Sequence, residues 1–303
     1  MPRLRIGTRR SALALWQAHR VRDLLVSAGA DVEIIEIVTS GDRIQDRPLA
    51  QVGGKGLFVK ELEEALLDGR CDLAVHSAKD VPSALPSGLM LAAFPMREDP
   101  RDALCAPRYR TIAALPPNAR IGTSSLRRAC ALRAARPDLD VQSVRGNVET
   151  RLRKGEDATQ LDGVVLALAG LKRLGLETHA TEILSLDVSL PAAGQGALAI
   201  ETAQSGAGRD FADRLDDPDT RAAVISERAV LRLLEGSCNV PLAAHAVHVD
   251  GALWLRACIG TPDGQRLLRA EARGAPPQAE MLGQDVGARL LAQGAKDILS
   301  VGH

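Results

Sequence analysis

Asp80 is the acidic side chain whose sequence context best suits chemistry on a small ligand. It follows a segment that predicts a buried strand ending at His76, and it has Ser77 and Lys79 beside it. Open α/β sheets bind ligands at the carboxyl ends of their strands. A carboxylate there can stabilise a developing cation and move protons at a nitrogen leaving group. The alternative is that Asp80 only caps the turn at Val81-Pro82, and the local sequence leaves both interpretations open.

Cys238 is the cysteine with the strongest claim to chemistry. It lies in the loop segment Glu235-Gly236-Ser237-Cys238-Asn239-Val240-Pro241, whereas Cys71, Cys130 and Cys258 fall in or beside regular elements and are expected to be core thiols. An exposed thiol that forms some thiolate can make a stable carbon–sulfur bond with an electrophile. A single cysteine is more often inert, and no protease-like signature accompanies this one. Covalent attachment and an inert thiol therefore both remain open.

The histidines predict neither catalysis nor a metal centre. His76 stands at a strand end, where a structural hydrogen bond is the more common role, so we assign it no catalysis. His245 and His248 resemble a metal pair, but their spacing on an alternating strand places them on opposite faces. We expect no metal site.

A weak internal repeat positions polar groups at two helix starts. Residues 5–11 are echoed by residues 120–128, and both segments read as a strand, a Gly-Thr turn and a helix. In each copy hydroxyl and Arg side chains stand where free N–H groups and the helix dipole favour an anion. Ser11 and Ser125 could instead be plain helix caps. Two opposed copies favour a shared anionic ligand.

The surrounding pattern predicts two α/β domains and a smaller α+β domain. The first copy continues with a helix at about 11–28, strands at 32–38 and 72–76 and a helix at about 58–68; the second continues with strands at 141–144 and 163–167. After residue 217 we expect a helix at about 220–234, strands around an Asp250-Gly251 hairpin, a strand near 266–272 and a helix at about 278–293. The long loop at residues 39–56 is a candidate lid.

Composition limits the classes of partner. The 303 residues carry 38 basic and 38 acidic side chains, so no global field attracts nucleic acid or a membrane, and any polyanion must bind to the basic cluster at residues 120–154. Five scattered cysteines without a Cys-x-x-Cys pair argue against a disulfide framework or structural zinc. The first residues lack the apolar stretch of a secretory signal, and no later segment has the run of about 18 apolar residues that spans a membrane. We expect a cytoplasmic protein.

Two motifs give the chain a family resemblance. It carries His76-Ser77-Ala78-Lys79-Asp80-Val81-Pro82 and Gly236-Ser237-Cys238-Asn239-Val240-Pro241 in the order found in porphobilinogen deaminases, which it resembles over nearly its whole length. Further matching segments lie at residues 6–9, 53–58, 97–102, 122–128, 145–148, 190–196 and 260–264. Ser237 stands where many relatives have Gly, which is a small-for-small change.

The resemblance implies an α/β protein with two lobes similar to periplasmic binding proteins and a small α+β C-terminal domain. The implied boundaries are residues 1–98 plus 195–215 for domain 1, 99–194 for domain 2 and 216–303 for domain 3. It also implies a cytoplasmic, monomeric transferase of tetrapyrrole biosynthesis, whose partner is the small molecule porphobilinogen rather than nucleic acid or a membrane. The family joins four porphobilinogen molecules head to tail on a covalent dipyrromethane primer, releases ammonia, and frees the linear product hydroxymethylbilane by hydrolysis.

The resemblance also implies roles for particular residues. Asp80 matches the catalytic aspartate, and Cys238 matches the cysteine that holds the dipyrromethane cofactor by a thioether. The positions that correspond to cofactor or substrate binding are Arg9, Ser11, Lys55, Ser77, Lys79, Thr123, Ser124, Ser125, Arg127, Arg128, Arg145, Gly146, Arg151, Arg173 and Gln195. Arg173 is assigned to a later elongation step. Each pyrrole bears an acetate and a propionate, which explains a site rich in arginine.

Two other classes of protein compete with this interpretation. A non-enzymatic binding protein for a small anion would explain the repeat and the arginines, but not the third domain or Cys238. A nucleic-acid-binding protein could use residues 120–154, but the chain has only six aromatic residues for base stacking and no net positive charge.

Overall fold

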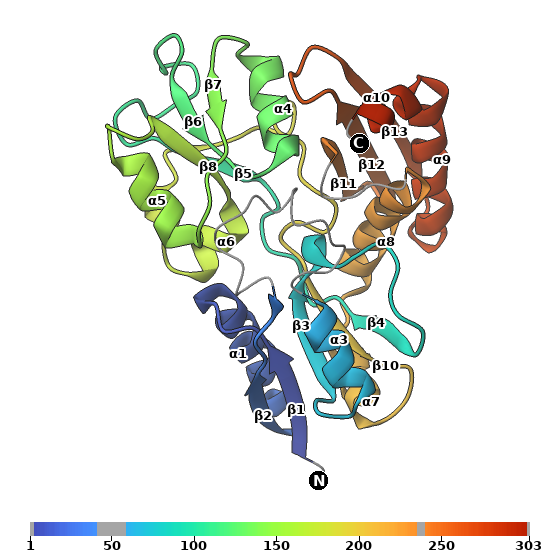
Figure 1. The fold of residues 1–303 in the computed structure, drawn as a ribbon. Coiled ribbons are helices and arrows are strands. Elements are labelled where there is room, and N and C mark those ends of the chain that lie inside the picture. Colours follow the sequence, from blue (N-terminus) through green and yellow to red (C-terminus); the bar gives the residue numbers. More distant parts are fainter. Residues whose placement is uncertain (1–2, 41–58, 235–239, 302–303) are drawn as a thin grey trace. The chain divides into compact units, whose positions relative to one another are not determined.

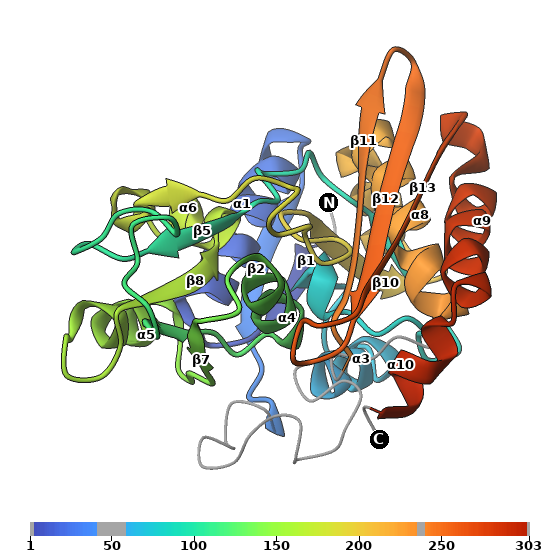
Figure 2. The same cartoon turned by 90° about the horizontal axis from the view of Figure 1, so that it is seen from above.

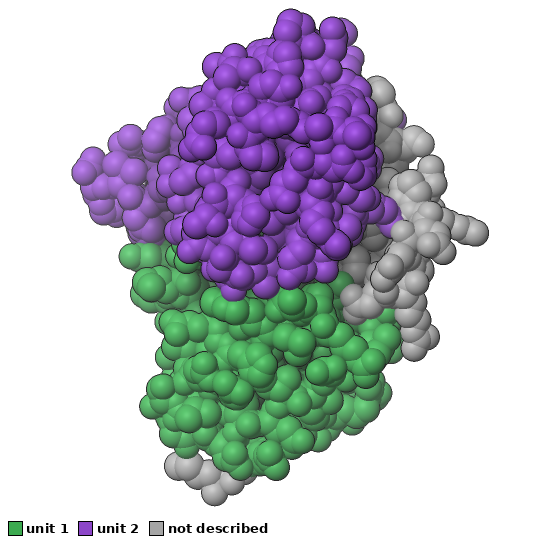
Figure 3. Space-filling view, turned by 90° about the vertical axis from the view of Figure 1, so that its left-hand side faces the viewer, with its two compact units in different colours: residues 1–98, 197–221 green, residues 99–196, 222–303 purple. Residues whose placement is uncertain are grey.

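The computed structural model describes residues 3–40, 59–234 and 240–301 of the chain. Lys55, Cys238 and most of the candidate lid lie outside these residues. The chain divides into two compact units: unit 1 comprises residues 1–98 and 197–221, and unit 2 comprises residues 99–196 and 222–303 (Figure 3). Each unit is described by itself.

Unit 1 is a five-stranded mixed sheet with helices on both faces. Its strands are β1 (Arg3–Thr8), β2 (Asp31–Glu36), β3 (Leu73–Ser77), β4 (Leu89–Ala93) and β10 (Leu198–Ala203), in the order β2-β1-β3-β10-β4 (Figure 1). The first three are parallel, and β10 is antiparallel to both of its neighbours. Helices α1 (Ala12–Ser27) and α7 (Ala207–Ala212) pack on one face and α3 (Lys60–Leu67) on the other. The short helix η3 (Asp213–Leu215) follows α7.

The first part of unit 2 repeats this architecture. Its strands are β5 (Asp102–Cys105), β6 (Arg120–Gly122), β7 (Asp140–Gln142), β8 (Gly163–Ala167) and β9 (Glu182–Ile183), in the order β7-β6-β8-β5-β9. Strands β6, β7 and β8 are parallel to one another. Strand β5, at the fourth position of the sheet, is antiparallel to its neighbours β8 and β9, as β10 is to its neighbours in unit 1. Helix α4 (Leu126–Ala135) covers one face, and α5 (Val148–Glu156) and α6 (Leu168–Arg173) cover the other. A short helix η2 (Glu177–His179) precedes β9. The predicted internal repeat is confirmed.

The repeated glycines allow close packing inside each copy. A Cβ on Gly7 would lie 2.9 Å from the Cys71 Sγ, and a Cβ on Gly122 would lie 2.7 Å from the Leu161 Cδ1. Real Cβ atoms do not approach so closely. Both glycines are therefore needed at the end of a strand where the chain turns toward the helix.

The second part of unit 2 is a three-stranded antiparallel sheet covered by helices. It contains β11 (Leu242–Val249), β12 (Ala252–Gly260) and β13 (Leu267–Gly274), with α9 (Ala279–Ala292), α10 (Ala295–Val301) and the short helix η4 (Pro276–Gln278). Helix α8 (Pro218–Leu233) contributes Val230 to the same core as Leu255 and Val286. Asp250 and Gly251 have φ values of 52° and 78°, as the central residues of a type I′ turn require, so the predicted hairpin is confirmed.

The predicted fold class, two α/β lobes with a small α+β part, is confirmed by these three sheets. Each sheet has its own hydrophobic core, as three domains would require, although residues 99–196 and 222–303 form one compact unit. The proposed domain boundaries stay a prediction. In the described part of the chain, no helix has the length and apolarity needed to span a bilayer.

Candidate functional site

Asp80 lies at the end of a strand that unit 1 holds firmly. Strand β3 is buried up to His76, and the short helix η1 (Ala78–Asp80) follows it directly. The Asp80 side chain is exposed, and its carboxylate makes no hydrogen bond or ion pair with any described residue. The main chain closes the turn itself, since the Val81 N–H donates to the Ala78 carbonyl at 3.4 Å. The turn-capping alternative therefore receives no support from the geometry.

Two hydrogen bonds, one of them buried, fix the strand end beside Asp80. The His76 Nε2 lies 2.9 Å from the Glu201 Oε2, and both side chains are almost completely buried. The Gln17 Nε2 donates to the Ser77 Oγ at 2.8 Å, which ties α1 to β3. His76 thus has the structural partner that the sequence predicted, and Ser77 is held in place for any contact with a ligand.

The hydroxyl groups at the two repeated helix starts act as caps. The Ser11 Oγ accepts from the Ala14 N–H at 3.3 Å at the start of α1, and the Ser125 Oγ accepts from the Arg128 N–H at 3.4 Å at the start of α4. The simpler alternative of helix capping is therefore present in both copies. A hydroxyl that accepts a capping bond still has a proton to donate, so capping does not prevent ligand binding.

The neighbouring predicted residues differ in exposure. Thr123 is buried and accepts the Ser125 N–H at 3.2 Å on its Oγ1, while Ser124 is exposed. In unit 1, Arg9 and Lys79 are partly buried.

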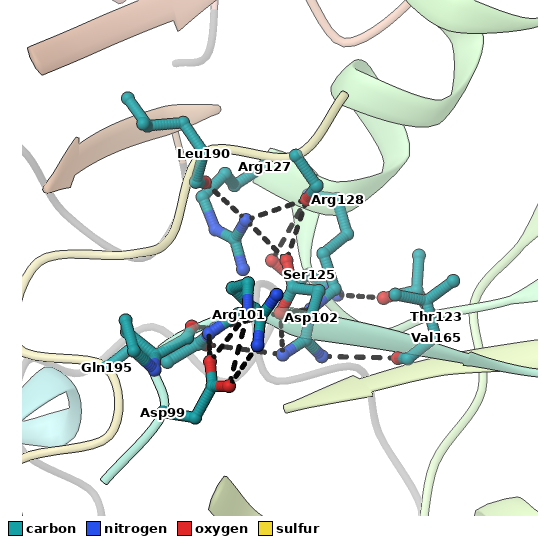
Figure 4. Close-up of polar contacts among 12 residues, drawn as sticks. Asp99, Arg101, Asp102, Thr123, Ser125, Arg127, Arg128, Val165, Leu190 and Gln195 are labelled. Atoms are coloured by element: carbon teal, nitrogen blue, oxygen red, sulfur yellow. Dashed lines mark hydrogen bonds and ion pairs between the residues drawn. The ribbon is translucent and has the colours of Figure 1, made fainter. Parts of the chain in front are cut away.

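A buried carboxylate organises the start of α4. Asp102, the first residue of β5, is completely buried and accepts from the Arg127 Nη1 at 2.8 Å and the Arg128 Nε at 2.9 Å (Figure 4). The Ser189 Oγ and the Gln195 Nε2 donate to the same carboxylate at 2.7 and 2.8 Å. Two adjacent side chains of α4 and two from the segment at residues 189–195 therefore converge on one anion.

The two arginines of this cluster are used differently. The Arg128 Nη1 donates to the Val165 carbonyl at 3.2 Å and its Nη2 to the Gln195 Oε1 at 3.3 Å, so all three of its nitrogens have protein partners. The Arg127 Nη1 also donates to the Leu190 carbonyl at 2.6 Å, but its buried Nε has no hydrogen-bond partner among the described residues.

The electrostatics of the cluster favour the charged carboxylate. Burial alone would raise the pKa of Asp102, but the positive charges of Arg127 and Arg128 and the hydrogen bonds to the carboxylate overcome it and hold that pKa well below its usual range. Burial also lowers the pKa of the Arg128 guanidinium, while Asp102 opposes the shift. The cluster is thus a buried ion pair with one cation in excess.

Asp102 is the residue that the sequence analysis missed. It closes the segment at residues 97–102, which was noted only as a matching motif. The available signal was an aspartate directly before the apolar run Ala103–Ala106, because a carboxylate in a buried strand must be paired. Nothing in the sequence showed which arginines pair with it.

The tight loop before α5 and the first turns of that helix carry three further predicted residues, Arg145 and Gly146 in the loop and Arg151 in the helix. Gly146 has φ of +115°, and a Cβ there would lie 2.6 Å from the Thr150 Cγ2. The Arg151 Nε donates to the Gly146 carbonyl at 2.8 Å. The Arg145 Nη2 is buried and has no hydrogen-bond partner within the described ranges. This loop therefore presents a guanidinium whose donor lacks a protein acceptor.

Arg173 and Gln195 are both buried in unit 2. The Arg173 Nη2 donates to the Gly196 carbonyl at 2.5 Å, and the Gln195 Nε2 donates to the Pro100 carbonyl at 2.6 Å as well as to Asp102. Both residues thus support the chain segment at residues 190–196.

The structure brings the predicted residues together in three groups. Ser77 and Asp80 share one strand end, and a second group consists of Arg145 and Gly146 in the loop before α5 with Arg151 in that helix. A third group surrounds Asp102. The third group consists of Thr123, Ser125, Arg127, Arg128 and Gln195. Among the described residues no group of three or more His, Cys, Asp or Glu side chains could hold a metal ion.

A duplicated α/β fold, with an exposed carboxylate at one strand end and guanidinium donors that have no acceptor among the described residues, is typical of an enzyme or binding protein for a small anionic molecule. Comparison with known proteins decides between the two. Residues 4–208 match the family model "Porphobilinogen deaminase, dipyromethane cofactor binding domain", and residues 221–292 match "Porphobilinogen deaminase, C-terminal domain". The porphobilinogen deaminase of Sorangium cellulosum is 58% identical over 295 residues, which cover 95% of this chain and 98% of the relative.

The chain belongs to the porphobilinogen deaminase family. It is a transferase, a hydroxymethylbilane synthase of tetrapyrrole biosynthesis, with a dipyrromethane cofactor-binding domain. Among solved structures, the methionine-binding protein MetQ matches with a TM-score of 0.45 and 13% identity over 70% of this chain and 89% of that chain. An arginine-specific periplasmic binding protein of Salmonella typhimurium matches with a TM-score of 0.38 and 12% identity over 73% and 94%.

The residues of unit 2 fit a polycarboxylate group such as dipyrromethane. A buried guanidinium nitrogen without an acceptor is costly, and a ligand carboxylate removes that cost. The Arg145 Nη2 is such a nitrogen, and it lies one residue from the strained turn at Gly146.

Proposed function

We propose that Asp80 is the catalytic carboxylate for deamination and condensation of porphobilinogen. The observation that carries this assignment is the exposed Asp80 carboxylate, which has no partner among the described residues although its strand end is fixed by His76 and Ser77. A carboxylate left without a protein partner can accept from a pyrrole N–H and balance the positive charge that develops as ammonia leaves. Its fixed backbone limits the reorganisation needed in the transition state.

The cofactor supplies the terminal pyrrole carbon on which the product grows, and we propose that Cys238 holds it by a thioether. Support comes from the family motif at residues 236–241, since Cys238 lies outside the described residues. Burial raises the pKa of the Cys71, Cys105, Cys130 and Cys258 thiols, which makes all four poor nucleophiles at neutral pH. Of the five cysteines, Cys238 therefore remains as the candidate for attachment of the cofactor.

We propose that the other predicted residues bind the acetate and propionate groups of cofactor and product. Arg145 is suited to direct contact because its buried Nη2 has no acceptor among the described residues. Arg151, whose Nε donates to the Gly146 carbonyl, is proposed from the family motif. Arg128 is suited to positioning, since all of its guanidinium nitrogens already have partners. Arg9, Ser11, Lys55, Lys79, Thr123, Ser124, Ser125 and Arg173 are proposed from the family motif alone.

The Asp80 assignment is tested by Asp80→Asn. Removing an electrostatic contact to the transition state typically lowers turnover by about 10²–10³-fold. We expect a loss of that size in the rate of steady-state hydroxymethylbilane formation. The thermal midpoint of unfolding should not change, because the exposed Asp80 side chain makes no hydrogen bond or ion pair with a described residue. Near-normal turnover would refute the assignment.

The carboxylate-binding assignment is tested by Arg145→Leu with Arg153→Leu as the matched control. Arg153 lies in the last turn of α5, the helix that follows this loop, but it is exposed, and within the described ranges its side chain donates to the Thr150 Oγ1 at 3.4 Å. We expect Arg145→Leu, and not Arg153→Leu, to raise the KM for porphobilinogen or to slow cofactor assembly. Equal effects of the two substitutions would contradict a specific role for Arg145.

The covalent attachment is tested by intact mass. We expect the Cys238 peptide of the purified protein to exceed the mass of the bare sequence by two linked pyrrole units. A bare mass that gains nothing after porphobilinogen is added would contradict the assignment.

We also propose that the protein is a cytoplasmic monomer that takes porphobilinogen as substrate. Family membership supports porphobilinogen as the substrate. Light scattering tests the monomeric state, and cell fractionation tests the cytoplasmic location. A dimer or an exported protein would show those predictions to be wrong.

A further inference from the structure

Unit 2 contains a cavity of about 440 Å³ that is lined almost entirely by residues outside the proposed cofactor and substrate site. Its walls come from α4, from the segment at residues 186–190 and from strands β12 and β13. Volumes of roughly 300–1,000 Å³ are typical of small-molecule sites. Of the residues proposed for the cofactor and substrate, only Arg127 lines it.

The cavity lies on the face of the antiparallel sheet that its helices leave uncovered. Along β12, Leu253, Leu255 and Ala257 are buried in the core with α8 and α9, so the alternate residues point to the opposite face. Those residues include Trp254 and Arg256, which line the cavity. Figure 2 shows α8 and α9 on one side of the sheet and α4 beyond the other side.

Two residues that line the cavity each have a buried guanidinium nitrogen without an acceptor in the described part of the chain. Arg127 is 7% exposed, and its Nε has no hydrogen-bond partner among the described residues; the same is true of the buried Arg256 Nε. An unmet donor in a buried site is destabilising, and more so when the group is charged. An anion in the cavity would satisfy such donors.

One wall of the cavity is flat and aromatic. The Arg256 guanidinium carbon lies 4.3 Å from the centroid of the Trp254 ring, which stacks a cation on a π-face. Leu190 and Leu267 line other parts of the cavity. Burial raises the pKa of the Cys130 thiol to about 11, so this lining residue is neutral and adds apolar surface.

The charges around the cavity leave one positive charge in excess. The cations are Arg127, Arg256 and Arg269 in the wall and Arg128 beside Arg127; the anions are Asp187 and Glu271 in the wall and Asp102 beneath it. A ligand with one negative charge would balance them.

We propose that this cavity binds a planar aromatic monocarboxylate. The ring would lie against the wall formed by Trp254 and Arg256, and the carboxylate would lie near the Nε–H donors of Arg127 and Arg256. The site shares only Arg127 with the residues proposed for the cofactor and substrate, and through Arg127 it would make the start of α4 sensitive to a second small molecule.

The test is calorimetric titration of the cofactor-loaded protein with 2-naphthoate. We expect binding that weakens about tenfold or more in Arg256→Gln, since loss of a charge-assisted hydrogen bond costs about 1.5–3 kcal/mol. The neutral analogue 2-naphthalenemethanol should bind at least about tenfold more weakly than 2-naphthoate for the same reason. Arg232→Gln is the control, because Arg232 is exposed on α8 and does not line the cavity.

Three results would overturn the proposal. The first is no binding of 2-naphthoate, and the second is equal affinity for the charged and neutral analogues. The third is binding that Arg145→Leu abolishes and Arg256→Gln leaves intact, since that would place the carboxylate at the cofactor loop. Trp254→Leu should weaken binding of 2-naphthoate but not of acetate, and the reverse would refute the aromatic wall.

Discussion

Replacing Asp102 by Asn should destabilise unit 2 more than any single surface ion pair could. The substitution keeps the shape of the side chain but removes the charge that compensates Arg127 and Arg128, which are 7% and 5% exposed. Breaking a buried pair by removing one partner typically costs about 3–5 kcal/mol, because the remaining charge is left buried and unpaired. Two buried cations depend on Asp102, so we expect a loss in that range.

Asp99→Asn is the matched control for this experiment. Asp99 also pairs with an arginine, since the Arg101 Nη2 lies 2.6 Å from its Oδ2, but the Arg101 side chain is 43% exposed. Solvent screens such a pair, and its loss should cost about 1 kcal/mol or less. Comparing Asp102→Asn with Asp99→Asn therefore separates the effect of burial on stability from the effect of ion pairing itself.

Tryptophan fluorescence during urea unfolding can report on unit 2 alone. Trp16 lies in α1 of unit 1 and Trp254 in β12 of unit 2, so both variants should be made in a Trp16→Phe background. If Asp102→Asn loses no more free energy of unfolding than Asp99→Asn, the buried ion pair does not organise this unit.

The pH dependence gives a second check on Asp102. Its folded pKa is held below the unfolded value of about 3.9, so its contribution to stability is present above that pH and is lost as the pH falls toward the folded pKa. The difference between wild type and Asp102→Asn should therefore be constant from about pH 5 to 8 and shrink below about pH 4. If the difference in stability between wild type and Asp102→Asn grew as the pH fell, Asp102 would not be the charged group that we infer.

Three smaller predictions concern single side chains. Burial and then the negative charge of Glu201 raise the pKa of Glu63, so folding disfavours its charged form. Glu63→Gln should therefore stabilise unit 1 at pH 7. In thermal melts at a series of pH values, this gain should vanish as the pH falls to the unfolded pKa of about 4.3. Gly146→Ala forces a Cβ onto Thr150 at positive φ and should cost about 1–3 kcal/mol by urea unfolding, whereas an unchanged midpoint would show that the loop relaxes. Ser125→Ala removes the cap of α4 and should cost about 1 kcal/mol, with Ser124→Ala as the exposed control.

Local sequence signals predicted the elements that depend on local physics. The Gly-Thr turns before α1 and α4 were recognisable because only Gly fits the close packing there, and the Asp250-Gly251 hairpin because its turn requires positive φ at both residues. The alternation of β12 separated core from non-core residues. Predicted helix ends agreed within about two residues, as for α8, which starts at Pro218 instead of Thr220.

The fourth strand of each α/β sheet could not be predicted in the same way. Strand β10 inserts between β3 and β4 from more than 100 residues further along the chain, and β5 pairs antiparallel with β8 from about 60 residues before it. Such pairing leaves no periodic signal at short range. For the same reason, the sequence showed an arginine-rich segment but not that Arg128 is fully engaged with Asp102, Val165 and Gln195.

The late insertion of β10 constrains how the chain can be made in the cell. Residues 1–98 contain four of the five strands of their sheet, but the strand that joins β3 to β4 arrives only at residues 198–203. A ribosome adding about 5–20 residues per second needs roughly 5–20 s to supply it after residue 98 has been joined. During that interval β3 and β4 have an unpaired edge, which is the kind of surface that aggregates or recruits a chaperone. The second α/β lobe, whose five strands lie within residues 102–183, completes its sheet first although its synthesis begins later.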